Sequence, residues 1–250
     1  MDITNILQKL EGSERFTFDF VGDSVTHGLN HCTADETYVA KFAKFISEKY
    51  NDRTVLRYDG IVLRECEPIK SYEGPITVSK GGEKTITVIR NGVGGDSVRR
   101  AINRIENFTG VLANNERPDV TFLMFGINDA LTSNPTKYVT PEVYIENYKE
   151  LISKIKESNP ETDIIILAPT TNGNSVYNHY LKLCEFVKEN DIPFIDTHKL
   201  WLDHYDANSH NYGQGDWLFG NGDACHPMPL SAEIIAKFIF DEFMKLIQSK

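Results

Sequence analysis

The residues of this chain that could carry chemistry are a serine near its start and an aspartate–histidine pair near its end. Ser24 closes the tripeptide GDS, and Asp223 and His226 lie three residues apart in the segment DACH. A serine hydroxyl is a poor nucleophile at neutral pH and needs a base within hydrogen-bonding distance. An imidazole can take that proton and return it, and a carboxylate can hold the ring in the right tautomer. We therefore predict nucleophilic catalysis, with Ser24 as nucleophile, His226 as base and Asp223 as the acid that orients the base.

Two further segments could stabilise the negative charge that develops on the substrate oxygen. They are the glycine-rich NGVGGD (91–96) and GIND (126–129), and each follows a predicted strand. The candidate donors are the backbone N–H groups of Ser24 and Gly95 and the side-chain amide of Asn128. Acids beside such turns usually accept hydrogen bonds from nearby backbone N–H groups, so we assign Asp23 and Asp129 supporting roles.

The sequence offers a second choice for both the nucleophile and the acid. Gly-Asp-Ser occurs again at 95–97, but Ser97 stands where a helix is predicted to begin, and capping that helix is the simpler explanation. Asp196 ends a predicted strand two residues before His198 and could replace Asp223 as the partner of the histidine. We interpret Asp196 and His198 as a structural pair, and we prefer Ser24 to Ser97.

The elements that must position these residues alternate between strand and helix. Phe16, Phe18 and Phe20 alternate with other residues in a β-prone run that stops at Gly22, two residues before Ser24. The predicted strands cover 16–21, 54–58, 61–63, 76–79, 85–90, 119–125, 163–168 and 192–195, and the predicted helices cover 3–10, 36–50, 97–108, 141–157, 175–189 and 230–247. This alternation predicts an α/β fold with a parallel sheet and helices on both faces. No linker divides the chain, so we expect a single domain over 1–250.

Four blocks of this sequence, in order, resemble a known family. GDSVTHG, the glycine-rich turn, GIND and DACHP are similar to the ordered blocks of the SGNH (GDSL) hydrolases, from the first strand to the last helix. The resemblance implies a three-layer α/β/α sandwich with a central five-stranded parallel sheet, the flavodoxin-like SGNH hydrolase fold. It also implies ester hydrolysis through an acyl-enzyme intermediate. It makes Ser24 the nucleophile, Gly95 and Asn128 oxyanion donors, Asp223 the orienting acid and His226 the base.

The chain departs from the family pattern at two places. About thirty residues, roughly 53–82, are inserted before the strand that precedes the glycine-rich turn, and the β-branched runs around Gly81-Gly82 predict a β-hairpin there. The insertion could shape the substrate pocket, mediate oligomerisation or simply extend the edge of the sheet. After the His-Pro pair, Met228 and Ser231 stand where many members have Asn and Gly, a change that concerns the entry into the last helix.

The predicted function is a serine esterase without a cofactor, acting on a small-molecule or carbohydrate ester, with acetyl on a carbohydrate as the first choice. A lysophospholipase or a thioesterase is the alternative within the family. A non-catalytic sugar-binding module is a further alternative, because five aromatic residues precede the DACH segment and could stack on a sugar ring. These are Trp201, Tyr205, Tyr212, Trp217 and Phe219.

Two cofactor-dependent classes are less well supported by the sequence. His27, His31 and Cys32, together with Cys225 and His226, have a spacing compatible with zinc and would suit a metal-dependent hydrolase. No HExxH motif or CxxC pair accompanies them, so we predict no metal site. The glycines of 92–94 resemble the start of a dinucleotide fingerprint, but serine occupies the third glycine position.

Composition bounds the partners of the protein. The 250 residues are 40% hydrophobic and carry a formal net charge of −10, which disfavours nucleic acid and anionic membranes. No apolar run approaches the ~20 residues that span a bilayer, so we expect no integral membrane association. The start MDITNILQKLEG lacks the features of a signal peptide, and the four cysteines are scattered. If Met1 is the native start, we expect a cytoplasmic protein with reduced thiols. The sequence does not fix the oligomeric state.

Overall fold

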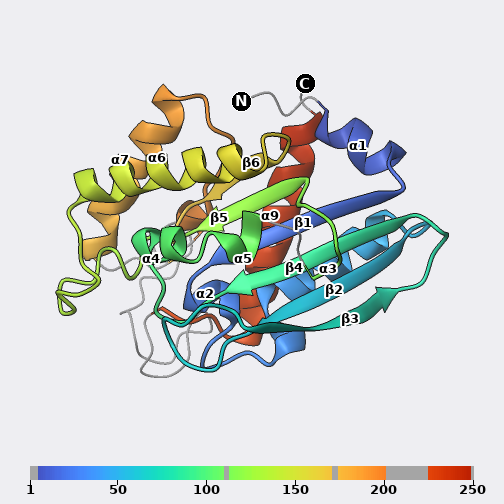
Figure 1. Ribbon diagram of the computed structural model, residues 1–250, viewed down its shortest axis with the longest axis horizontal. Coiled ribbons are helices and arrows are strands. Elements are labelled where there is room, and N and C mark those ends of the chain that lie inside the picture. The colour runs from blue at the N-terminus through green and yellow to red at the C-terminus, as the bar shows by residue number, and fades with distance from the viewer. Residues whose placement is uncertain (1–4, 110–112, 171–173, 201–224, 249–250) are drawn as a thin grey trace.

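A seven-stranded sheet runs through the middle of the molecule, in the order β3-β2-β4-β1-β5-β6-β7 (Figure 1). The computed structural model describes residues 5–109, 113–170, 174–200 and 225–248. The strands are β1 (Arg15–Gly22), β2 (Thr54–Ile61), β3 (Ser71–Ser79), β4 (Thr85–Gly92), β5 (Val120–Met124), β6 (Asp163–Leu167) and β7 (Phe194–Ile195). Neighbouring strands are parallel throughout, except that β2 and β3 are antiparallel.

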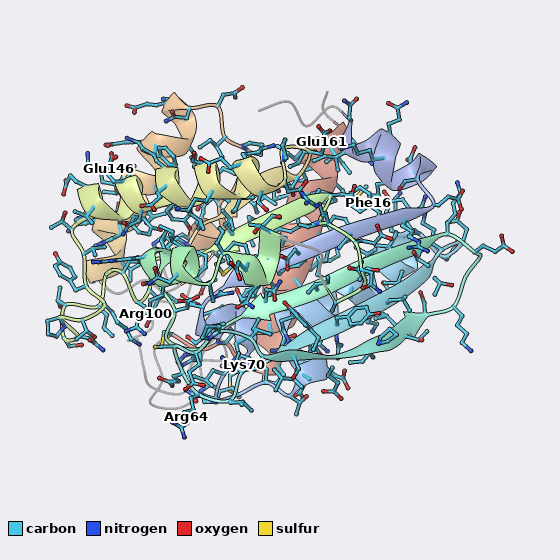
Figure 2. All side chains as sticks on the ribbon, viewed as in Figure 1. Phe16, Arg64, Lys70, Arg100, Glu146 and Glu161 are labelled. Atoms are coloured by element: carbon cyan, nitrogen blue, oxygen red, sulfur yellow. The ribbon has the colours of Figure 1, made fainter. Side chains whose placement is uncertain are left out.

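Helices cover both faces of this sheet. One face packs against α1 (Ile6–Gly12), α3 (Tyr38–Lys49) and α9 (Pro229–Gln248), and the other against α4 (Val98–Asn103), α5 (Glu106–Thr109), α6 (Pro141–Ser158) and α7 (Asn174–Glu189). Two hydrophobic clusters fill the spaces between the sheet and these helices. Figure 2 shows side chains packed between the sheet and the helices. The predicted three-layer α/β/α sandwich is therefore confirmed.

The phenylalanines of β1 form the centre of the first cluster. Phe18 contacts Phe42 of α3 and Phe243 of α9, each with ring centroids 5.5 Å apart. Phe20 stacks on Phe122 of β5 at 4.5 Å. Buried aromatic pairs of this kind add to the free energy gained from burial alone. Strand β1 is thus fixed at the middle of the sheet, and so is the turn that follows it.

The sheet contains the predicted five parallel strands and two more. The strands β4-β1-β5-β6-β7 have the 2-1-3-4-5 order that is typical of flavodoxin-like folds. Strands β2 and β3 come from the inserted segment and extend the sheet beyond β4. The difference in strand count arises because the insertion adds to the sheet at the edge formed by β4.

The hairpin predicted around Gly81-Gly82 is wrong. The strand after it, β4, pairs in parallel with β2, and β3 pairs with the far side of β2, so β2 lies between β3 and β4. The segment 80–84 instead returns past the start of β2, where the Gly82 N–H donates to Asp52 O at 2.6 Å. The antiparallel pair within the insertion is therefore β2 with β3.

Two smaller expectations also changed. The helix predicted over 97–108 is divided into α4 and α5, because the chain turns at Arg104, whose side chain is buried. The strand predicted over 61–63 is not separate, since β2 continues to Ile61.

The register of the central strands brings three loops to one place. Gly22, the last residue of β1, pairs with Gly92 of β4 and with Met124 of β5. The carboxyl ends of these three strands are therefore level, and the loops that follow them meet at the edge of the sheet where α/β proteins bind ligands. Within the described residues, no helix has both the length and the apolar character needed to span a bilayer.

Candidate active site

Ser24 lies at the sharp turn from β1 into the short helix α2 (Ser24–His27). The side chain of Asp23 caps this helix by accepting a hydrogen bond from Val25 N at 2.9 Å. A Cβ on Gly22 would overlap Thr26 Oγ1 and lie 2.8 Å from Met124 O, so only glycine fits the end of the strand. The turn is consequently tight, and the serine is fixed at the edge of the sheet.

His226 reaches Ser24 from the far end of the sequence. Its Nε2 lies 2.9 Å from Ser24 Oγ, although the two residues are 202 positions apart. His226 is half-buried and stands three residues before α9, which packs against the core. Ser24 is 5% exposed. A hydroxyl and an imidazole at this distance are the pair that an activated serine nucleophile requires.

The other ring nitrogen of His226 faces Asn30, a residue that the sequence did not single out. Asn30 Nδ2 lies 3.1 Å from His226 Nδ1, and Cys225 Sγ lies 3.5 Å from the same nitrogen. Asn30 has a φ of 72°, which asparagine adopts more readily than most residues. Because either end of an amide can be turned toward the ring, Asn30 can hold its orientation. Asp223 lies outside the described residues, so its role as the orienting acid stays a prediction.

Asp196 and His198, the alternative pair, have contacts of a structural kind. Asp196 accepts hydrogen bonds from the Tyr180 hydroxyl at 2.9 Å and from Lys199 N at 3.1 Å. His198 stacks on Tyr180, with centroids 4.1 Å apart, and its burial lowers the pKa of the imidazole. Both residues are thus engaged near the end of β7. The five aromatic residues between 201 and 219 lie outside the described residues.

The glycine-rich turn and the GIND segment are joined directly. Asn128 Nδ2 donates to Asp96 O at 2.7 Å, and the Asp129 carboxylate accepts from Val98 N at 3.2 Å. Gly95, with a φ of +74°, occupies the left-handed region that favours glycine. Gly95 and Asn128 therefore lie in adjoining loops, and their role as oxyanion donors stays a prediction. Asn128 is 6% exposed.

The second serine has a different neighbourhood. Ser97 caps α4, because its Oγ accepts a hydrogen bond from Arg100 N at 3.4 Å. The preceding Asp96 forms a buried ion pair with Arg104, with 2.6 Å between Oδ2 and Nε. The contacts at Ser97 are those of a helix cap and agree with the preference for Ser24.

Lys137 was not identified from the sequence, yet it reaches the same cluster. Its Nζ donates to Asn128 Oδ1 at 3.3 Å and lies 2.7 Å from the position that a Cβ on Gly95 would occupy. Lys137 belongs to the loop between β5 and α6, and no sequence motif in this loop identifies it as a site residue. Its ammonium group adds positive charge beside the two candidate oxyanion donors.

The inserted segment also reaches the site. In the loop between β2 and β3, Cys66 N donates to Gly94 O at 2.8 Å, and Cys66 Sγ donates to Gly95 O at 3.4 Å. The insertion is held to the sheet by Asp59, which forms ion pairs with Arg57 and Arg90 at 3.0 and 3.1 Å. The insertion therefore both extends the sheet and rests against the glycine-rich turn.

Three buried carboxyl groups surround these loops, and burial raises the pKa of each. For Asp23 it raises the pKa to about 7, with a further contribution from the nearby Asp96 and an opposing one from Lys137. Burial also raises the pKa of Asp129 and of Asp96, although Arg104 counteracts the effect at Asp96. Perturbed titratable groups gather at functional sites more often than elsewhere. The three buried carboxyl groups thus support a functional site at the carboxyl ends of β1, β4 and β5.

The residues considered as zinc ligands do not form a metal site in the part of the chain that the structure describes. No group of three or more His, Cys, Asp or Glu side chains there could hold a metal ion. Cys32 Sγ instead donates to Pro227 O at 3.4 Å, which braces the segment that carries His226.

Comparison with a protein-family model gives one match. The model of the GDSL-like lipase/acylhydrolase family matches residues 75–233. This segment contains Gly95, Asn128, Asp223 and His226, whereas Ser24 precedes it. No curated protein matches the sequence.

Solved structures share the fold at low sequence identity. A two-domain esterase (CEX) active on acetylated mannans is 15% identical with a TM-score of 0.68; the match covers 98% of this chain and 53% of that one. This chain thus spans about half of the two-domain esterase. A peptidoglycan O-acetylesterase is 13% identical with a TM-score of 0.67, and the match covers 99% of this chain and 96% of that one. The acetyl xylan esterase AlAXEase is 15% identical with a TM-score of 0.63, and the match covers 90% and 98%, respectively.

Proposed function

This chain belongs to the GDSL-like lipase/acylhydrolase family, and from that premise we propose that it is a serine esterase that removes short acyl groups, acetyl above all, from carbohydrates. The observation that carries the proposal is the 2.9 Å separation of Ser24 Oγ and His226 Nε2. A serine so placed at the carboxyl edge of a central strand can attack a bound ester without rearrangement of the backbone.

The proposed reaction has two halves. Ser24 Oγ attacks the ester carbonyl carbon while its proton passes to His226 Nε2, and the imidazolium then gives that proton to the departing alcohol. This leaves the acyl group on Ser24 as an ester. A water molecule, deprotonated by His226, attacks this acyl-enzyme and releases the acid, and the proton returns to Ser24. In this scheme Asp223 and Asn30 hold the ring.

The oxyanion formed in each half is proposed to bind the N–H groups of Ser24, Gly95 and Asn128. One N–H of the Asn128 amide donates to Asp96 O at 2.7 Å, which leaves its second N–H for the substrate. Lys137 donates to the carbonyl oxygen of the same amide. That contact polarises the amide and strengthens its remaining donor.

The substrate class is supported by the structural neighbours. The proteins with the same fold include an esterase active on acetylated mannans, a peptidoglycan O-acetylesterase and an acetyl xylan esterase. Each of them is named for acetyl groups carried by a saccharide. We extend this class to the present chain because its loops surround the serine in the same fold.

The proposal is tested by hydrolysis of 4-nitrophenyl acetate with wild type and Ser24→Ala, each with and without EDTA. We expect wild-type activity to survive EDTA, and we expect Ser24→Ala to lose at least roughly 10³-fold in kcat, as removal of a catalytic serine does. Circular dichroism checks that the variant is folded. Loss of wild-type activity in EDTA would favour the metal-dependent hydrolase, and a folded Ser24→Ala variant with full activity would remove Ser24 as nucleophile.

A further inference from the structure

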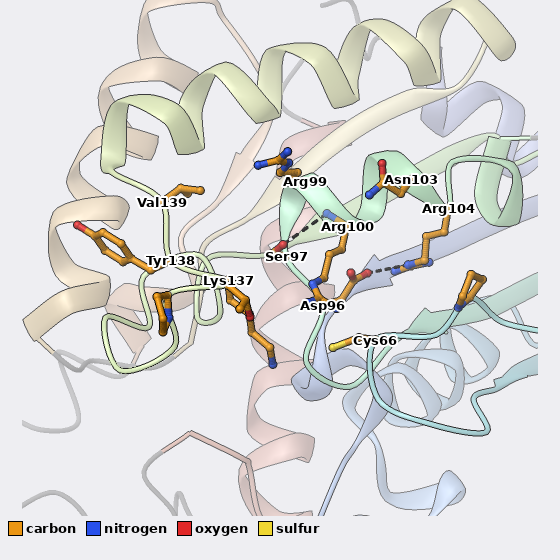
Figure 3. A pocket seen from close by; sticks show the side chains of 13 residues that line it. Cys66, Asp96, Ser97, Arg99, Arg100, Asn103, Arg104, Lys137, Tyr138 and Val139 are labelled. Atoms are coloured by element: carbon orange, nitrogen blue, oxygen red, sulfur yellow. Dashed lines mark hydrogen bonds and ion pairs between the residues drawn. The ribbon is translucent and has the colours of Figure 1, made fainter.

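A cavity of about 430 Å³ opens between α4 and the segment 135–139, beside the glycine-rich turn (Figure 3). Lys137 enters it from the loop before α6, and Arg99, Arg100 and Arg104 enter it from α4 and its C-terminal end. Cys66 of the inserted segment lies at its border. The cavity is therefore built from parts of the chain that also form the candidate oxyanion hole.

The lining of this cavity is strongly basic. It includes four cationic side chains and one acid, Asp96, which gives a formal charge of +3 in a chain whose net charge is −10. Asp96 is already paired with Arg104 at 2.6 Å. In the described parts of the chain, Arg99, Arg100 and Lys137 form no ion pair. Arg100 and Lys137 interact with carboxyl groups only beyond ion-pair distance, Arg100 with Asp96 and Lys137 with Asp23.

One acid outside the lining approaches the same turn. Glu65 Oε2 lies 3.5 Å from the position of a Cβ on Gly95, compared with 2.7 Å for Lys137 Nζ. Glu65 is exposed and does not line the cavity. Its carboxylate therefore lies beside the glycine-rich turn and, among the described residues, forms no ion pair with Arg99 or Arg100.

Two hydrogen bonds connect residues that line the cavity to Asn128. Lys137 Nζ donates to Asn128 Oδ1 at 3.3 Å, and the backbone oxygen of Asp96 accepts from Asn128 Nδ2. A volume of about 430 Å³ far exceeds what an acetyl group fills and lies within the range of small-molecule sites. The cavity is thus large enough for the alcohol part of the ester.

We propose that this cavity binds an anionic group, a carboxylate or a phosphate, on the alcohol part of the ester, so that the substrate is an acetylated acidic saccharide. The inference rests on the proposed esterase function and adds the charge of the substrate. Guanidinium groups bind carboxylate and phosphate through paired N–H donors, and a lysine adds a point charge. The mixture of arginines with one lysine suits such a group.

The test measures binding without hydrolysis. Glucuronate, glucose 6-phosphate and neutral glucose are titrated into the wild-type protein, and amide chemical shifts are followed by NMR. We expect both anions, or one of them, to bind more tightly than glucose, and the comparison of the two anions identifies the charged group. Equal affinity for all three sugars would overturn the proposal.

Variants locate the site. Arg99→Gln and the double variant Arg99→Gln/Arg100→Gln should weaken anion binding stepwise, by roughly three- to tenfold in the double variant, as expected for partly exposed charges. Lys154→Gln, which removes one positive charge from the exposed face of α6, is the matched control for Arg99→Gln and should bind as the wild type does. Anion binding that is unchanged in the double variant, or equally reduced in the control, would overturn the proposal.

A kinetic comparison separates this inference from the esterase proposal. The substrates are 4-acetoxybenzoate and its neutral methyl ester, and the measured quantity is the ratio of their kcat/KM values in wild type and in the double variant. We expect the ratio to fall in the double variant. Anion binding in a protein that hydrolyses neither ester would contradict the esterase function and leave the anion site in place, whereas a ratio that does not change would contradict the anion site alone.

Discussion

The tripeptide Gly-Asp-Ser occurs twice in this protein, at 22–24 and at 95–97, and the two copies lie in comparable places. Each copy follows a strand of the central sheet, β1 or β4, and leads into a helix, α2 or α4. In the first copy the aspartate caps the helix, and the serine hydroxyl lies 2.9 Å from His226 Nε2. In the second copy the serine itself caps the helix, by accepting from Arg100 N.

The aspartates differ as much as the serines. Asp96 is buried against the Arg104 guanidinium, whereas Asp23 is buried with a backbone N–H as its hydrogen-bond donor and has a pKa of about 7. The same three residues therefore have different surroundings, which are set by segments far away in the sequence. The candidate nucleophile is therefore distinguished by the histidine that contacts it and by which residue caps the helix.

The largest effect on stability is expected in the second copy. Arg104→Met leaves the Asp96 carboxyl buried without its partner, which should lower the free energy of unfolding by about 3–5 kcal/mol. Urea denaturation measures the loss. The double variant Arg104→Met/Asp96→Asn, which removes the charge as well, should recover part of it. A loss below about 1 kcal/mol in the single variant would mean that the ion pair does not distinguish the two copies.

Asn128 links the two copies, since it contacts Asp96 O and is proposed to serve the substrate that Ser24 attacks. Asn128→Ala should lower kcat for 4-nitrophenyl acetate by roughly 10²–10³-fold, as removal of one oxyanion donor does, with a smaller change in KM. Steady-state kinetics with a circular dichroism control checks this. Full activity in a folded Asn128→Ala protein would remove the residue from the oxyanion hole.

The Asp23 carboxyl of the first copy should make the free energy of unfolding depend on pH. Because burial raises the pKa of Asp23 from 3.8 to about 7, the unfolded chain releases this proton at lower pH than the folded one does. The contribution of Asp23 to the free energy of unfolding is therefore fully present below about pH 4 and is lost as the pH rises through 7. Asp23→Asn keeps an acceptor for Val25 N but cannot ionise.

Relative to Asp23→Asn, the wild type should lose roughly 2–3 kcal/mol of unfolding free energy between pH 5 and pH 8. Urea unfolding at the two pH values gives this difference directly. Parallel pH profiles for wild type and Asp23→Asn would show that Asp23 ionises in the folded protein as it does in the unfolded chain, which would contradict the raised pKa.

Ser97→Ala should have the smallest effect. Removal of the cap of α4 is expected to cost about 1 kcal/mol of unfolding free energy, as for other N-cap serines. Its esterase activity should stay close to that of wild type, in contrast to Ser24→Ala. Thermal unfolding and a 4-nitrophenyl acetate assay test both parts. A folded Ser97→Ala variant without activity would reverse the roles of the two serines.

Local patterns predicted the parts of this fold that depend on neighbouring residues. The alternating phenylalanines of 16–20 predict the buried strand β1, and the glycine of the first copy marks its end. The hairpin predicted around Gly81-Gly82 was wrong because strand pairing does not depend on neighbouring residues alone. Strand β2, and not β3, pairs with the edge of β4. The helix predicted over 97–108 is divided at Arg104. The side chain of Arg104 is buried, which the periodicity of the sequence does not reveal.

The candidate site likewise combines residues that local sequence motifs identify with residues that only long-range contacts bring to it. The Gly-Asp-Ser, GIND and DACH segments could be singled out because their residue types suit a known chemistry. Asn30, Cys66 and Lys137 could not, since each lies in an irregular loop and reaches the site only through the fold. The reactive roles assigned from the sequence stay predictions, and the structure adds residues that contact the same loops.

The most direct test of Ser24 as the nucleophile is to label the wild-type protein with an active-serine fluorophosphonate. The modified serine is then found by peptide mass spectrometry. Such a reagent bonds covalently to the serine whose hydroxyl is activated by a base. The contact between Ser24 and His226 predicts a single adduct on the peptide that contains Ser24, and no adduct in the His226→Ala variant. An adduct on Ser97, or equal labelling of wild type and the His226→Ala variant, would contradict the assignment of the nucleophile.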